Sequence, residues 1–328
     1  MRTLCLILTA AAVLTAADRK RVIAMPKAGV TTPGVQIPMS KLKPEAEIAV
    51  PGATAILGIP EAVWVGTLAG IVPIDTKLNK AGDRIAAVKA PCAGLATGFD
   101  GTWIADCGNK SIARLQAKTN ESKAVIASGA AAALQGIAAT GDSIWALTDE
   151  KGTLSRIDPA SGKVVAETRL PAGCTSMVSA EKSLWVTCAS THQLLRIDPL
   201  TNLVEKYIDV AAEPRSLVFA EGSIWVLGSE KGKVSRVDPK TNKVTATIEL
   251  QIPNGKGEIT AGAGSVWVTA KGFPITRIDP KTDQVVQQFA GDGGGALRFG
   301  ANSLWLVNIA QQTVWRVDPK RVLATFAE

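Results

Sequence analysis

The stretch SIWVLGSEKGKVSRVDPKTNKVTATI, residues 223–248, decides the fold because variants of it recur along the chain. Its tryptophan, Trp225, is one of seven that occur in similar short phrases, at Trp64, Trp103, Trp145, Trp185, Trp225, Trp267 and Trp305. The steps between them are 39, 42, 40, 40, 42 and 38 residues. A period near 40 that holds several short apolar runs is typical of one four-stranded blade per repeat. We therefore predict an all-β fold, a seven-bladed β-propeller of four-stranded antiparallel blades.

The repeat around Trp225 shows why these residues form strands. Alternating apolar and polar residues predict strands, and Gly222 and the Asp-Pro-Lys-Thr-Asn segment at 238–242 predict the tight turns between them. The four strands are expected at 216–219, 223–226, 234–238 and 244–248. The phrase Arg-Ile/Val-Asp-Pro occurs five times, beginning at Arg156, Arg196, Arg236, Arg277 and Arg316. Residues shared by most blades serve turns and packing, so we interpret these arginines and the tryptophans as structural.

The N-terminal residues indicate export. A basic start, an apolar stretch over residues 3–14 and the small residues 15–17 predict a signal peptide at 1–17. Residues 18–46 are proline-rich and basic without a period, which predicts an extended leader before a propeller at 47–328. No later segment is apolar enough to span a membrane. The protein is expected in the periplasm or the medium.

Two segments are candidates for the strand that closes the ring. Residues 47–50 look like the outer strand of a blade, supplied from the far end of the chain. Residues 322–326 also look like an outer strand. Either would pair the first and last blades and remove an exposed sheet edge, and the sequence leaves both open.

Length and charge limit the partners. The 328 residues carry a net charge of +7, with basic residues scattered through the turns. This surface has no nucleic-acid motif, so nucleic-acid binding is not favoured. The repeats cover nearly all of the chain after the leader, which predicts one closed domain, and we expect a monomer.

Four cysteines fall into two pairs with matched spacing. Cys92 and Cys107 flank Trp103, and Cys174 and Cys188 flank Trp185. In antiparallel strands such positions meet at the same end of a hairpin, so each pair can form a disulfide within its blade. A metal site is the alternative, but the close Cys-x-x-Cys spacing of zinc sites is missing.

Residues that break the repeat near the central channel are the candidates for function. At the position nine residues before the repeat tryptophan, Glu258 is the only charged residue among the seven repeats. At the position ten residues before it, Arg215 is the only charged residue. An ion pair at the channel mouth is the alternative interpretation for Arg215 and Glu258. The remaining candidates for ligand contact on this rim are Lys256, Arg298, Gln135 and Thr175, with Asp106 and Asn308 close by. His192, the only histidine, lies in a loop on the same face, as a candidate general base or a solvated loop residue.

The blade motif resembles the exported YncE-like (YVTN-type) propellers and the related virginiamycin B lyase-like group, over about residues 47–328. The lyases open the ring of streptogramin B antibiotics with magnesium, histidine and glutamate. The resemblance would make His192 the catalytic base and Glu258 its partner or a metal ligand. This chain has one histidine where the lyases use more, and it lacks their Trp-Phe-Thr-Glu form of the motif. Lactonase-type propellers instead hold calcium with residue types that Glu258, Asn308 and Asp106 would supply.

The sequence thus predicts an exported, non-enzymatic binding or scaffold module. Its top face would recognise a small molecule, a polymer or a protein, without a cofactor. The alternative is a metal-dependent enzyme of the lyase or lactonase type, with Mg or Ca.

Overall fold

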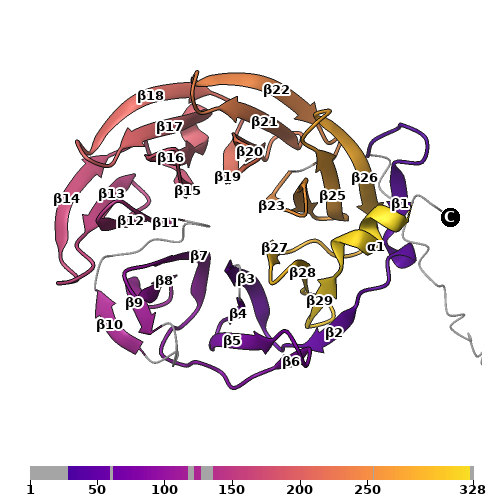
Figure 1. The fold of residues 1–328 in the computed structure, drawn as a ribbon, viewed down its shortest axis with the longest axis horizontal. Helices are drawn as coiled ribbons and strands as arrows, with labels where there is room; N and C mark the ends of the chain where they lie inside the picture. Colours follow the sequence, from indigo (N-terminus) through magenta and orange to yellow (C-terminus); the bar gives the residue numbers. More distant parts are fainter. Residues whose placement is uncertain (1–28, 60–61, 117–121, 127–135, 254, 326–328) are drawn as a thin grey trace, which may run out of the picture.

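The computed structural model describes residues 29–328, except 60–61, 117–121, 127–135, 254 and 326–328. Seven sheets surround a central axis, and in each the strand nearest the axis comes first in a four-strand series (Figure 1). The predicted seven-bladed β-propeller is confirmed. The predicted signal peptide, the first part of the leader and Gln135 lie outside the described residues.

The first five blades are each built from four consecutive antiparallel strands. Blade 1 contains β3 (Ala53–Ile59), β4 (Ala62–Thr67), β5 (Gly70–Asp75) and β6 (Lys80–Ala81). Blade 2 contains β7 (Pro91–Gly98), β8 (Gly101–Asp106), β9 (Ser111–Gln116) and β10 (Ser122–Ile126). Blade 3 contains β11 (Ile137–Thr140), β12 (Ser143–Leu147), β13 (Thr153–Ile157) and β14 (Val164–Arg169).

Blades 4 and 5 follow the same order and carry the most regular copies of the repeat. Blade 4 contains β15 (Cys174–Ala180), β16 (Ser183–Cys188), β17 (Gln193–Asp198) and β18 (Leu203–Asp209), with a 3-10 turn at Ala189–Thr191. Blade 5 contains β19 (Pro214–Ala220), β20 (Ser223–Gly228), β21 (Lys233–Asp238) and β22 (Lys243–Glu249). The four strands predicted around Trp225 are confirmed.

Blades 6 and 7 each receive a strand from the N-terminal part of the chain. Blade 6 contains β23 (Gly257–Gly262), β24 (Ser265–Ala270), β25 (Phe273–Asp279) and β26 (Gln284–Ala290), and β1 (Gln36–Pro38) adds a fifth, parallel strand. A 3-10 turn at Met39–Lys41 then leads on to blade 7. Blade 7 contains β27 (Leu297–Gly300), β28 (Ser303–Asn308), β29 (Thr313–Val317) and β2 (Ala46–Ala49). Part of the leader is thus ordered as strand, and blade 6 departs from the predicted four-stranded, wholly antiparallel plan.

The N-terminal strand closes the ring. β2 pairs antiparallel with β29, with Ile48 opposite Val314. The strand expected over residues 322–326 is wrong, because Pro319–Ala324 form the helix α1. The Asp318 side chain accepts a hydrogen bond from the Lys320 amide at the start of α1, and Val322 is buried. With the outer edge of β29 already occupied by β2, this helix packs beside blade 6 instead of joining the sheet (Figure 1).

Arginine and tryptophan side chains join neighbouring blades. The Arg196 guanidinium lies over the Trp185 ring, 5.3 Å from its centroid, and Nη1 donates to the Pro239 carbonyl in the next blade at 3.0 Å. Arg236 repeats this arrangement with Trp225 and Pro280. The Trp225 ring is fully buried. These contacts agree with the structural interpretation of the repeated residues.

The aspartates of the Asp-Pro turns predict sensitivity to acid. Hydrogen bonds from the Leu200 and Lys240 amides hold the pKa of Asp198 and of Asp238 below its ordinary value. A carboxyl with a lowered pKa in the folded state stabilises the fold above the unfolded-state pKa of about 3.9, and this stabilisation disappears as the pH falls through the lower folded-state value. We expect the unfolding temperature to fall below about pH 4. On acidification, the unfolding temperature of Asp238→Asn should fall less than that of the wild type, as measured by circular dichroism. An equal fall in both proteins would contradict this account.

Candidate functional site

A pocket of about 370 Å³ opens where blades 4, 5 and 6 meet, beside the entries to their innermost strands. Four residues singled out from the sequence line it together, namely Thr175, His192, Arg215 and Lys256. Glu213, Ser190 and Ser229 complete its polar lining. Two cationic side chains, one carboxylate, one imidazole and hydroxyl groups therefore face one cavity. We call this cavity the top-face pocket.

His192 is held by blade 5. It ends the 3-10 turn in the left-handed conformation, with φ of 57°. Its Nδ1 accepts a hydrogen bond from the Glu213 amide at 3.0 Å. A ring nitrogen that accepts carries no proton, so in this arrangement the neutral imidazole carries its hydrogen on Nε2. His192 thus presents an N–H donor; the sequence left open a general base or a solvated loop residue.

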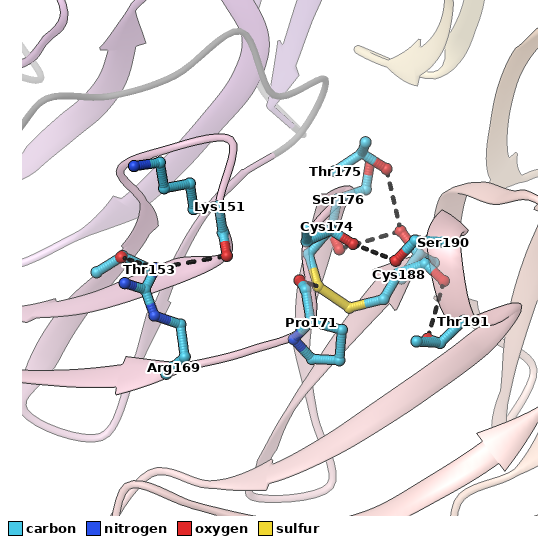
Figure 2. Close-up of a disulfide and its surroundings, with 12 residues drawn as sticks. Lys151, Thr153, Arg169, Pro171, Cys174, Thr175, Ser176, Cys188, Ser190 and Thr191 are labelled. Atoms are coloured by element: carbon cyan, nitrogen blue, oxygen red, sulfur yellow. Dashed lines mark hydrogen bonds between the residues drawn. A yellow bond between two sulfur atoms is a disulfide. The ribbon is translucent and has the colours of Figure 1, made fainter.

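Arg215 is fixed through its backbone. Its carbonyl accepts hydrogen bonds from the Thr175 hydroxyl at 3.0 Å and the Ser176 hydroxyl at 2.7 Å. The disulfide between Cys174 and Cys188 lies directly beside these two hydroxyl residues (Figure 2). Since Cys188 is followed by residues that line the pocket, the disulfide ties together two segments of its wall.

Glu213 was not among the residues predicted from the sequence, although the sequence holds a signal for it. At the position twelve residues before the repeat tryptophan, the seven blades have Gly52, Pro91, Ala133, Gly173, Glu213, Gly255 and Gly293. Glu213 is the one charged residue in that column, and its own φ of 53° matches a position that favours glycine. The Ser229 hydroxyl donates to its Oε2 at 2.8 Å. A charge and a strained backbone coincide here at the mouth of the pocket.

Glu258 and Arg298 form an ion pair and do not line the top-face pocket with the other candidates. Arg298 Nη1 lies 2.7 Å from Glu258 Oε2, with side chains 11% and 9% exposed. The same oxygen accepts a hydrogen bond from the Leu297 amide at 3.3 Å. The ion-pair interpretation that the sequence left open for Glu258 is therefore the one the structure shows, with Arg298 as the partner.

The three residues proposed for calcium have separate hydrogen-bond partners. Asp106 is buried and accepts from the Lys89 and Asn109 amides. Asn308 bonds with Gln311, and Glu258 with Arg298. Among the described residues, no three His, Cys, Asp or Glu side chains are grouped as a metal site requires. The three residues that the lactonase resemblance assigns to calcium thus do not form one donor set.

Both predicted disulfides are confirmed, Cys92 with Cys107 and Cys174 with Cys188. Each joins the first and second strands of one blade, a loop of about fifteen residues worth roughly 3 kcal/mol in the chain-entropy model. Disulfides persist in oxidising compartments, so the pair is consistent with an extracellular or periplasmic protein. Within the described part of the chain, no helix is both long and apolar enough to cross a membrane.

The architecture and the pocket define the class as a seven-bladed propeller with a polar site on one face, and solved propellers agree. A streptogramin B lyase structure superposes with a TM-score of 0.70 at 18% identity, covering 83% of this chain and 96% of that one. The virginiamycin B lyase of Staphylococcus aureus superposes with a TM-score of 0.69 at 17% identity, covering 83% of this chain and 97% of that one. The structure of U3-55K superposes with a TM-score of 0.67 at 10% identity, covering 84% of this chain and 100% of that one. At these identities the likeness is one of fold.

The particular family comes from the sequence. The family model described as glutamine cyclotransferase matches residues 89–262, more than half of the chain. The chain belongs to this family. A search of curated protein sequences found no match. The matched range contains every residue that lines the top-face pocket.

Proposed function

We propose that the protein is an exported enzyme that closes a glutamine residue with a free α-amine into a lactam, at the top-face pocket. The observation that carries this proposal is that the glutamine cyclotransferase match, residues 89–262, spans the whole pocket, residues 175–256. A non-enzymatic scaffold, as predicted from the sequence, has no support in these comparisons. The lyase and lactonase alternatives need a metal ion, and among the described residues no group of three His, Cys, Asp or Glu side chains that could hold one is present.

The pocket holds the groups that this reaction needs. The α-amino nitrogen attacks the γ-carbonyl carbon, the carbon–nitrogen bond of the amide breaks, and ammonia leaves. The Glu213 carboxylate would take the proton from the amine and pass it to the departing ammonia. The positive charges of Arg215 and Lys256 and the His192 Nε2–H would stabilise the negative oxygen that forms on the carbonyl carbon. No metal takes part in this scheme.

Turnover of a dipeptide tests the proposal. The oxidised protein is incubated with Gln-Ala, and ammonia release is measured together with the matching loss of mass. Nα-acetylated Gln-Ala is the control substrate, since its nitrogen is no longer a free amine. Glu213→Gln should lower the rate at least about 100-fold, because it removes the proton acceptor without changing its size.

Glu181→Gln is the matched control variant. Glu181 is an exposed glutamate of blade 4 that shares the left-handed backbone of Glu213, with φ of 49°. It lies in the turn between β15 and β16, outside the pocket, and should keep the wild-type rate. Absence of ammonia release by the wild type, or equal rates for Glu213→Gln and Glu181→Gln, would overturn the proposal.

A further inference from the structure

The central channel is a second cavity, and most of the side chains that line it are apolar. It has a volume of about 200 Å³, and all seven innermost strands contribute to its wall. The larger side chains that line it are Leu57, Leu95, Ile137, Met177, Leu217 and Ile259. A ligand that contacts this wall is stabilised by the removal of its own apolar surface from water.

The channel carries no net charge. Arg298 is the one charged side chain among the described residues that line it. Its ion pair with Glu258 neutralises that charge within the wall. An acidic group therefore has no charge-based reason to enter the channel, whereas Arg215 and Lys256 attract it to the top-face pocket.

The wall of the channel continues into the wall of the pocket. On β19, Arg215 lines the pocket and Leu217, two residues on, lines the channel. On β15, Thr175 likewise lines the pocket and Met177 lines the channel. The pocket and the channel are therefore neighbours along these two strands, which is the arrangement that a ligand with a polar end and an apolar part would need.

We propose that the channel is a subsite for a short apolar chain whose attached acidic group or amide occupies the top-face pocket. The inference rests on the pocket of the proposed function and names its substrate class, but it does not depend on the reaction. A volume of about 200 Å³ lies below the 300–1,000 Å³ typical of pockets for drug-sized ligands, so the chain is short and narrow.

Binding of unbranched carboxylic acids from acetate to octanoate, measured by titration calorimetry, tests this inference. These acids cannot cyclise, so the result is independent of the proposed reaction. Each added methylene should tighten binding about fourfold until the channel is filled. Arg215→Ala should weaken all the acids by a similar factor, because it removes a charge that only the carboxylate contacts.

Val218→Phe narrows the channel, since Val218 lines it on β19. This variant should abolish the gain with chain length and leave acetate binding unchanged. Val178→Phe makes the same test from blade 4 if the first variant does not fold. Val244→Phe, on the exposed outer strand of the same blade, is the control and should bind like the wild type.

The outcomes separate the two proposals. Equal affinities for all chain lengths would overturn the channel subsite, and so would a chain-length gain that persists in both narrowed variants. Cyclisation of Gln-Ala is measured separately, and its failure alone would overturn the reaction while leaving a chain-length gain as evidence for the subsite.

Discussion

Ile48→Asp should open the ring and lower the free energy of unfolding by about 3–5 kcal/mol, because a buried side chain in the closing strand is replaced by a charge. Ile48 is 5% exposed and packs with Val314 and Trp305 between blades 7 and 1. The strand β2 is also the part of blade 7 that comes from the opposite end of the chain. Its loss would expose the edge of β29, which chemical denaturation should reveal as a lower midpoint.

Ala49→Asp is the matched control, since it places the same charge on the exposed face of the same strand. We expect it to change the free energy of unfolding by no more than about 0.5 kcal/mol. If Ile48→Asp unfolds at the same denaturant concentration as Ala49→Asp, β2 does not hold the ring closed.

The blade plan could be predicted from the sequence because each strand and turn recurs in several copies. The closing strand was left open between residues 47–50 and 322–326, because both segments are short and both look like an outer strand. The fifth residue of each Asp-Pro turn, counted from the aspartate, decides whether the chain continues as an outer strand. In blades 3 to 6 this residue is Gly162, Asn202, Asn242 or Asp283, each with a positive φ that permits the turn into an outer strand. Blade 7 has Val322 there, a β-branched residue for which that conformation is unfavourable, and the chain continues as a helix.

The candidate site was predicted in part. Arg215, Lys256 and His192 were identified because they break the repeat or are unique, and the structure places them in one pocket with Thr175 of the same rim. The hydrogen bond from the Glu213 amide to His192 could not be predicted, because it joins loops of two blades. The direction of the Glu258 side chain likewise depends on packing between blades 6 and 7, which a repeat pattern does not encode.

Glu258→Ala should lower the free energy of unfolding by about 3–5 kcal/mol, since it leaves a buried guanidinium without its carboxylate. The Arg298 side chain is only 11% exposed, so water cannot replace the lost oxygen fully. The variant also removes the acceptor of the Leu297 amide. Thermal and denaturant unfolding of the oxidised protein would measure the loss.

The double variant Glu258→Leu/Arg298→Leu separates an ion pair from a metal site. When both charges are replaced by apolar groups, much of the stability should return, because neither a buried charge nor its partner remains. If Glu258 were instead a metal ligand, magnesium or calcium would raise the unfolding temperature of the wild type and not of Glu258→Ala. A saturable shift of that kind would contradict the ion-pair account and favour a metal-dependent reaction over the proposed cyclisation.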